Sequence, residues 1–151
     1  MTQYKIIMSN NICLCAEKLQ FVNISVVKDD PKITKVIVRF YGTSCCDVTV
    51  DNYLSSMKKV YADKIPFVIL YDATQIGRVS LGTINKMAKF MREFDEATNE
   101  FMLRCAITLS SEWARAALKM LFVIKPPACK ELDTFTTLKK AKSWLAEITI
   151  K

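Results

Sequence analysis

The chain has 151 residues, of which 51% are hydrophobic, and it carries a formal net charge of +7 with no histidine. A chain of this length buries roughly 68–70% of its unfolded surface in one compact unit, so we expect a single domain over residues 1–151. The lack of histidine excludes every catalytic plan that uses an imidazole. The apolar runs fall far short of the ~20 residues that a membrane-spanning helix needs.

The six cysteines give no metal-binding pattern. They include no CxxC motif, and structural zinc sites use cysteine and histidine at recognisable spacings, so we expect no metal site and no cofactor. The N-terminal residues lack the long apolar segment and the cleavage site of a signal peptide, which favours a cytoplasmic location with reduced thiols. Cys105 falls in an apolar run and is expected to be a small core residue.

The basic net charge would attract nucleic acid, anionic membranes or acidic proteins. The lysines are scattered, with pairs such as Lys58-Lys59 and Lys139-Lys140 on the solvent faces of predicted helices. No alternation of aromatic and basic residues suited to stacking on bases is present, which argues against nucleic acid as a partner.

The first part of the chain predicts strands that are joined by short turns. The predicted strands cover residues 4–8, 12–15, 21–27 and 36–41. A turn at Asn10-Asn11 joins the first two strands, and Asp29-Asp30-Pro31 ends the third. Such short connections make neighbouring strands antiparallel.

A helix, a buried strand, a polar loop and a second helix follow. Thr49 is predicted to be the N-cap of the first helix, which ends near Lys64. The continuous apolar run 67–71 is typical of a strand buried on both faces, and Asp72 is expected to end it. A polar loop is predicted over residues 73–79. Apolar residues then recur at helical spacing, at Leu81, Ile84, Met87, Ala88, Met91 and Phe94.

The last third predicts a second buried strand over residues 101–109, a helix, a short strand near 130–135 and a final helix. Ser110 or Ser111 caps the first of these helices, and Trp113 in its first turn could face a ligand or the core. The predicted buried stripe of that helix is Ala114, Ala117, Leu118, Leu121 and Phe122. The stripe of the final helix is Leu138, Ala141, Trp144, Leu145 and Ile148. Strands separated by helices pair in parallel, so the predicted fold class is α/β, a mixed sheet with antiparallel N-terminal strands followed by αβαβα.

Three segments carry a resemblance to a known superfamily. They are TVDNYLSSMKKVYADK (49–64), PFVILYDATQI (66–76) and CKELDTFTTLKKAKSWL (129–145). They resemble the first helix, the central strand with its turn, and the closing strand and helix of the STAS superfamily, in its stand-alone SpoIIAA-like branch. This branch overlaps in fold with lipid-binding SEC14-type domains. The resemblance covers roughly residues 20–148 and implies a non-enzymatic regulatory module.

The same resemblance implies a phosphorylation site at the start of the helix after the central strand. In the antagonist branch, the loop there carries Asp-Ser-Ser-Gly, and a kinase phosphorylates its second serine. This chain has GRVSLG over residues 77–82, so matching the Leu-Gly pair places Val79 at the phosphorylated position and Ser80 one residue later. Ser80 therefore has two interpretations. It is a helix N-cap, which serine strongly favours, or a phosphorylated side chain at a helix N-terminus.

We expect the loop after the central strand to bind the partner, because ligands usually meet such sheets at the carboxyl ends of the strands. The polar and charged side chains of this loop form the predicted partner or ligand site together with Phe90, which lies off the apolar stripe of its helix. The residues are Asp72, Thr74, Gln75, Arg78, Ser80 and Phe90. Asp72 could instead be structural, since no second titratable group accompanies it in the motif.

The sequence favours a regulatory or protein-binding module over an enzyme, because it lacks histidine, a nucleophile–base pattern and a Gly-rich phosphate loop. No motif identifies the partner protein. The alternative is a carrier of lipid or another hydrophobic ligand that acts at anionic membranes. The SEC14-type likeness, the positive charge and the Met/Phe-rich helix after the central strand support it. The surplus apolar face of that helix also predicts a homodimer contact.

Overall fold

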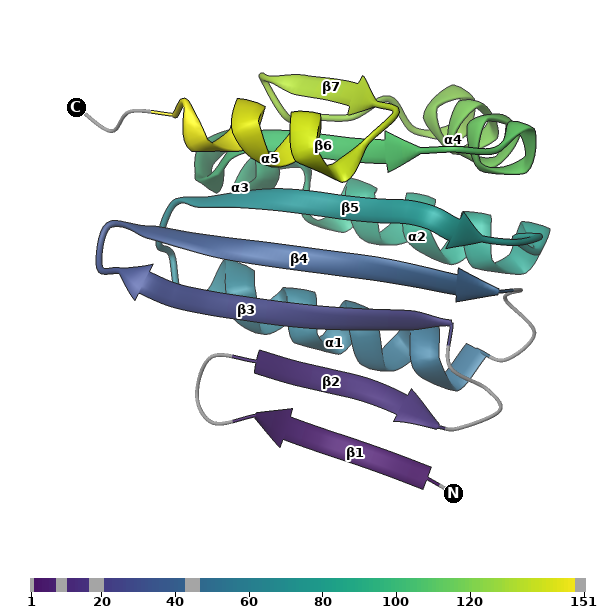
Figure 1. The fold of residues 1–151 in the computed structure, drawn as a ribbon, viewed down its shortest axis with the longest axis horizontal. Helices are drawn as coiled ribbons and strands as arrows, with labels where there is room; N and C mark the ends of the chain where they lie inside the picture. Colours follow the sequence, from purple (N-terminus) through teal and green to yellow (C-terminus); the bar gives the residue numbers. More distant parts are fainter. Residues whose placement is uncertain (1, 8–10, 17–20, 43–46, 149–151) are drawn as a thin grey trace.

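The computed structural model describes residues 2–7, 11–16, 21–42 and 47–148, with side chains from 21–42 and 50–148. Seven strands form one sheet, in which the order of strands in space follows their order in the chain (Figure 1). The elements are β1 (Thr2–Ile7), β2 (Asn11–Ala16), β3 (Val22–Asp30), β4 (Ile33–Gly42), α1 (Asp47–Ala62), β5 (Phe67–Ile76), α2 (Leu81–Glu93), α3 (Asp95–Phe101), β6 (Met102–Leu109), α4 (Glu112–Ile124), β7 (Leu132–Phe135) and α5 (Leu138–Ala146).

The strand pairing changes from antiparallel to parallel at β4. Strands β1 to β4 pair in antiparallel fashion, with Ile24 of β3 opposite Val38 of β4. Strands β4 to β7 pair in parallel, with Val38 opposite Tyr71 of β5. A strand that is reached through a helix runs in the same direction as its neighbour, which explains the change. The predicted mixed α/β sheet is confirmed, while the predicted strand end at Met8 and the turn residue Asn10 lie outside the described residues.

Helices cover both faces of the sheet, but unequally. Helices α1 to α4 lie behind the sheet in Figure 1 and form the main core with it, whereas α5 lies in front. Side chains alternate along β5, so Phe67 belongs to the main core and Leu70 packs with Ala106 and Ala141 on the α5 side. Trp144 of α5 packs into this second cluster, as predicted. Both faces of β5 are therefore buried, in agreement with its continuous apolar run.

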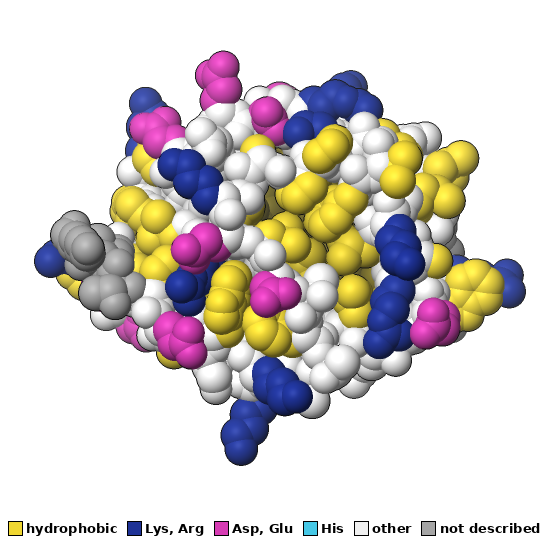
Figure 2. Space-filling model, turned by 90° about the horizontal axis from the view of Figure 1, so that it is seen from above, with side chains coloured by type: hydrophobic (Ala, Val, Ile, Leu, Met, Phe, Trp, Pro, Cys, Tyr) yellow, Lys and Arg dark blue, Asp and Glu magenta, His cyan; other side chains and the backbone are white. Residues whose placement is uncertain are grey.

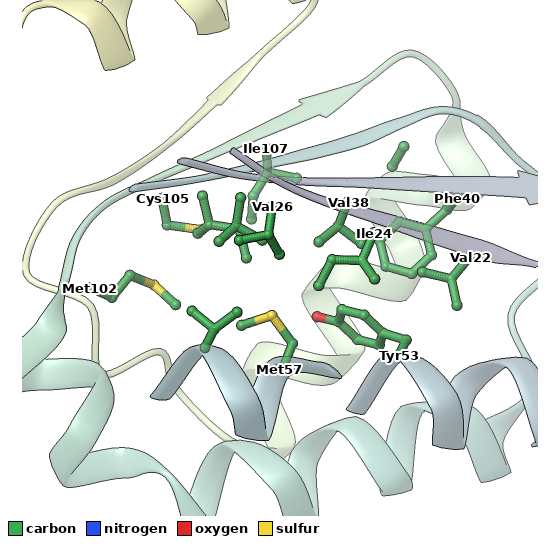
Figure 3. Close-up of a cluster of buried hydrophobic side chains, with 14 of the residues drawn as sticks. Val22, Ile24, Val26, Val38, Phe40, Tyr53, Met57, Met102, Cys105 and Ile107 are labelled. Atoms are coloured by element: carbon green, nitrogen blue, oxygen red, sulfur yellow. The ribbon is translucent and has the colours of Figure 1, made fainter. Parts of the chain in front are cut away.

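The main core lies between the sheet and α1. In Figure 3, Val26, Val38 and Cys105 project from strands of the sheet towards Met57 and Tyr53 of α1. All five side chains are buried, and Met57 is only 1% exposed. The prediction that Cys105 is a small core residue is confirmed.

Three predicted element boundaries are wrong. Strand β5 continues to Ile76 instead of ending at Asp72, because β4 runs on beside it past a shift in register. Helix α1 begins at Asp47, so Thr49 lies inside the helix and is not its N-cap. Helix α3 was not predicted, and it takes in Phe101, which was assigned to the strand that follows. Its acidic first turn suits a helix N-terminus.

Candidate functional site

The carboxyl ends of β5 and β6 lie side by side and carry the loops that lead into α2 and α4. The hydroxyl of Ser110, after β6, donates to the backbone carbonyl of Thr74 in β5 at 2.8 Å. Ser80 caps α2 and Ser111 caps α4, each accepting a backbone N–H three residues further on at 3.1 Å. Both caps agree with the sequence prediction. We call these two loops, with the first turns of α2 and α4, the carboxyl edge.

Asp72 is held inside β5 and is not presented by a loop. It is 8% exposed, and its Oδ1 accepts hydrogen bonds from the backbone N–H of Thr74 at 3.1 Å and from Thr74 Oγ1 at 2.6 Å. Its Oδ2 lies 3.7 Å from Nε of Arg39 on β4. Both carboxylate oxygens therefore have partners within the fold, in line with a structural role for this residue.

An exposed tryptophan and an arginine meet at the carboxyl edge. Trp113, in the first turn of α4, is 59% exposed, and Cζ of Arg78 lies 5.1 Å from the centroid of its ring. This distance is typical of a cation–π interaction. Leu81, the first residue of α2, is also 59% exposed, so its predicted place on the buried stripe is wrong. We call Arg78, Ser80, Leu81 and Trp113 the edge cluster.

The other predicted loop residues lie along the end of β5. Thr74 is half-buried and hydrogen-bonded to Asp72, while Gln75 is exposed, opposite Tyr41 of β4. The structure brings only Arg78 and Ser80 of the predicted site residues into the edge cluster. Gln75 lies three residues before Arg78 in the chain.

Phe90 lies apart from the carboxyl edge, in an aromatic cluster between α1 and α2. Its ring stacks on Phe94 with 4.5 Å between centroids and lies 6.2 Å from the ring of Tyr61. Tyr61 also stacks on Phe94 at 4.8 Å and meets Phe67 edge-on at 5.3 Å. Phe90 is half-buried by these contacts, so it is not a surplus surface side chain. Phe90 lines the interior cavity described below and is not part of the loop surface.

The main core also encloses an apolar cavity of about 160 Å³ between the sheet and helices α1, α2 and α4. The described residues that line it include no Lys, Arg, Asp or Glu. Large apolar side chains form most of its wall, among them Phe40, Met57, Met87, Phe90, Leu118 and Phe122. The cavity is a second candidate site, of a chemical character opposite to that of the carboxyl edge.

Two pairs of hydroxyl groups line this cavity. The hydroxyl oxygens of Tyr53 in α1 and Tyr71 in β5 lie 3.0 Å apart, and that of Tyr61 lies 2.6 Å from Oγ1 of Thr98 in α3. Burial raises the pKa of Tyr53 and Tyr71 above the ordinary range and raises the pKa of Tyr61 to about 12. Burial likewise raises the pKa of the Cys105 thiol. At neutral pH the cavity therefore offers uncharged hydrogen-bonding groups.

The cavity adjoins a surface groove between α4 and β7. Leu118, Phe122 and Leu132 line both the cavity and a shallow surface groove between these elements. Figure 2 views this end of the molecule and shows a hollow surrounded by hydrophobic side chains, with both basic and acidic side chains around it. Ala114 is the buried residue of α4. The predicted stripe of α4 faces inward, but its other positions are only partly buried and line the cavity.

The cavity and its hydroxyl pairs were not predicted, although one signal was present in the sequence. The apolar stripe of α1 contains Tyr53 and Tyr61, whose hydroxyls need hydrogen-bond partners when they are buried. Those partners, Tyr71 and Thr98, belong to other elements, so no local pattern could identify them.

The cavity offers hydroxyls and thiols, and the edge cluster offers one hydroxyl, an indole ring and a guanidinium. Among residues 21–42 and 50–148, no group of three or more Cys, Asp or Glu side chains could hold a metal ion. In the part of the chain that the structure describes, no helix combines the length and the apolar character needed to cross a bilayer.

Comparison with solved structures identifies the fold. The chain is similar to an uncharacterized protein of the DUF3478 family with a SpoIIAA-like fold from Shewanella loihica PV-4, with a TM-score of 0.61 and 18% identity, covering 87% of this chain and 98% of that one. It is also similar to an anti-sigma factor antagonist from Mycobacterium paratuberculosis, with a TM-score of 0.52 and 14% identity, covering 83% and 95% of the two chains. No family model and no curated protein matches the sequence. The fold is SpoIIAA-like, as the resemblance implied.

Proposed function

We propose that this protein is a non-enzymatic regulatory module that binds a partner protein through the edge cluster. The observation that carries the proposal is the exposed pair of Trp113 and Arg78, with the exposed Leu81 three residues after Arg78 in the chain. Tryptophan and arginine are enriched among the residues that dominate binding energy at protein interfaces. The guanidinium covers part of the ring and helps to hold it, while the remaining ring surface is open to a partner.

The similar structures and the cavity chemistry support regulation over catalysis. One similar protein is by name an anti-sigma factor antagonist. The tyrosine hydroxyls and the Cys105 thiol that line the cavity stay protonated at neutral pH, so they do not supply a general base or a nucleophile there. The edge cluster presents a cation and an indole ring, which suit recognition.

The test is quantitative binding to a partner isolated with this protein as bait. We expect Trp113→Ala to weaken affinity at least about tenfold, or about 1.4 kcal/mol, and Arg78→Ala to weaken it severalfold. Lys139→Ala, an exposed position on α5 at the other face of the sheet, is the control and should bind like the wild type. Equal affinities for the three variants, with unchanged thermal unfolding, would contradict the proposal.

Ser80 stands where phosphorylation would alter the edge cluster. Its Oγ accepts from the backbone N–H of Thr83 at 3.1 Å and donates to Thr83 Oγ1 at 2.9 Å, as an N-cap does. A phosphate there would lie at a helix N-terminus, near Arg78 in the chain. If Ser80 is a switch, Ser80→Asp changes partner affinity severalfold, and mass spectrometry of the protein from its own cells finds the phosphate. If Ser80 is found unmodified and Ser80→Asp binds the partner with wild-type affinity, Ser80 acts only as the N-cap of α2.

The cavity favours a second candidate function, a carrier of a hydrophobic ligand that meets anionic membranes. Its wall is apolar, and it adjoins a surface groove beside β7. The net charge of +7 would draw the protein towards an anionic surface. Native mass spectrometry after mild purification and binding to anionic vesicles at low salt test this function. If no lipid co-purifies and no vesicle binds, the carrier function is excluded.

We also propose a homodimer contact, on the outer face of α4 instead of on α2. Met120 and Val123 are 48% and 83% exposed on α4, whereas Phe90 on α2 is half-buried. An exposed apolar helix face is a common two-fold contact. Sedimentation velocity over a wide concentration range should detect a dimer that Val123→Glu dissociates. A monomer at every concentration would remove this proposal.

A further inference from the structure

The size of the cavity limits what it can hold. An engineered cavity of ~150 Å³ lined by Leu, Ile and Phe side chains stays dry and binds benzene. The cavity here measures about 160 Å³ and has a similar apolar wall. A molecule of roughly six to ten non-hydrogen atoms would fill it without movement of the helices.

The chemistry of the wall limits the ligand further. No Lys, Arg, Asp or Glu is among the described residues that line the cavity, so a buried charge on the ligand would have no counterion. The Tyr53 hydroxyl lies in the space between α1 and the sheet, as Figure 3 shows, 3.0 Å from that of Tyr71. In such a pair one O–H donates to the other oxygen, and the second O–H is a donor that the cavity can offer to a ligand.

We propose that this cavity is a binding site for a compact, neutral, mostly apolar molecule with one hydroxyl or carbonyl group, which hydrogen-bonds to the Tyr53–Tyr71 pair. The inference rests on the second candidate function, because it requires that the cavity take a ligand, but it requires no membrane. A molecule without a polar group fits the same space and binds more weakly, since it leaves the second O–H without a partner.

The ligand enters between α4 and β7. Leu118 and Phe122 of α4 and Leu132 of β7 stand between the cavity and the surface groove, and all three are only half-buried. Side chains that are partly exposed change rotamer more readily than close-packed ones, so small movements at this opening admit a molecule of the stated size. Lys119 and Asp133 line the groove outside the cavity, where they stay in water.

The test uses three probes of nearly the same shape, namely p-cresol, toluene and the p-toluate anion. Protein with ¹³C-labelled methionine methyl groups reports their position, because Met57, Met87, Met91 and Met102 line the cavity and Met120 is exposed on α4. We expect p-cresol and toluene to shift the four cavity methyl signals and to leave Met120 unchanged. We expect p-toluate to cause no shift at the same concentration.

Substitutions of the tyrosines test the hydrogen bond to the ligand, and substitutions on α4 test whether the ligand occupies the cavity. The double variant Tyr53→Phe/Tyr71→Phe should weaken p-cresol about tenfold and leave toluene unchanged, because it removes both hydroxyls and with them the hydrogen bond to the ligand. Tyr53→Phe and Tyr71→Phe alone each keep one hydroxyl that can donate to p-cresol, so each should weaken p-cresol less than the double variant does. Ala117→Phe, which places a ring in the cavity, should abolish binding of both probes, whereas Ala116→Phe on the exposed side of α4 should not.

The opposite results overturn the inference. Absence of shifts with both neutral probes removes the site, and p-toluate binding equal to that of p-cresol removes the restriction to neutral ligands. Equal p-cresol affinity for the double variant and the wild type removes the assigned hydrogen bond. If the neutral probes fail while native mass spectrometry still finds a bound lipid, the carrier function stands and only this class of ligand is wrong.

Discussion

Helices α1 and α4 carry the same kind of apolar stripe and lie on the same face of the sheet, but their packing differs. Five inward positions of α1 are at most 6% exposed, namely Val50, Tyr53, Met57, Val60 and Tyr61, and only Leu54 is half-buried. On α4, Ala114 is 3% exposed, and the larger inward side chains, such as Leu118 and Phe122, are only half-buried. The two helices therefore bury different fractions of similar sequence patterns.

The difference follows from what each helix rests on. Helix α1 packs directly on β2 and β3, whereas α4 packs mainly on α2 and reaches the sheet at β5. The cavity occupies the space left beneath α4. An apolar stripe thus indicates which side of a helix faces inward, but not how closely that side approaches its neighbours. Incompletely packed regions open locally at lower free energy, and ligand sites are found there.

The largest expected effect compares the two helices directly. Met57→Ala should lower the free energy of unfolding by about 2–5 kcal/mol, because Met57 is 1% exposed and its truncation enlarges the cavity that it borders. Leu118→Ala should cost about 1–2 kcal/mol, since Leu118 is half-buried and already borders empty space. Urea denaturation at unchanged m value measures both. Equal losses would mean that α4 is packed as tightly as α1.

The second expected effect uses a titratable group on the α1 side. Burial raises the pKa of Tyr61 from its ordinary 10.0 to about 12, although its hydrogen bond with Thr98 acts in the opposite direction. The folded state then holds this proton more tightly than the unfolded state. Its contribution to stability is complete below pH 10 and is lost as pH rises to about 12, amounting to about 2–3 kcal/mol.

Alkaline denaturation of the wild type and Tyr61→Phe measures this contribution. The free energy of unfolding of Tyr61→Phe should fall less steeply between pH 10 and 12 than that of the wild type, because the variant has no phenol at this position. Parallel curves for the two proteins would show that Tyr61 is not buried in solution.

The smallest expected effect comes from substitutions that enlarge a side chain, one at a close-packed position and one beside the cavity. Ala88→Leu, at a 0% exposed position of α2, should destabilise the fold by about 1–3 kcal/mol because the added atoms have no space. Ala117→Leu should be neutral or stabilise the fold by up to about 1 kcal/mol, since its added atoms enter the cavity. Thermal unfolding measures both. A loss for Ala117→Leu as large as that for Ala88→Leu would mean that the cavity is closed in solution.

The central elements could be predicted because their signals are local. The apolar run that begins at Phe67 marks a buried strand, and Ser80 bonds to a backbone N–H three residues away. The end of β5 at Ile76 could not be predicted, because its pairing with Gly42 of β4 determines it. Helix α3 is too short for its periodicity to stand out.

Less of the candidate sites could be predicted, since they depend on contacts between elements. Arg78 and Ser80 were located because the fold class fixes where the central strand ends. The contact of Arg78 with Trp113 joins the loop before α2 to the first turn of α4, and no local pattern encodes it. The aromatic contacts of Phe90 come from α1 and from the end of α2. The cavity depends on the distance between α4 and the sheet, which side-chain volumes from several elements determine together.

The spatial order of the strands also has a consequence for how the chain folds. Each strand is hydrogen-bonded to the strands that come before and after it in the sequence. Because paired strands are neighbours in the sequence, each pairing closes only the connection between them, and the entropy lost on closing a loop grows with its length. No pairing therefore has to wait for a distant part of the chain. During synthesis, each new strand can join the edge formed by the strand made just before it. The sheet can therefore grow from β1 to β7, in the order in which the ribosome synthesises the strands.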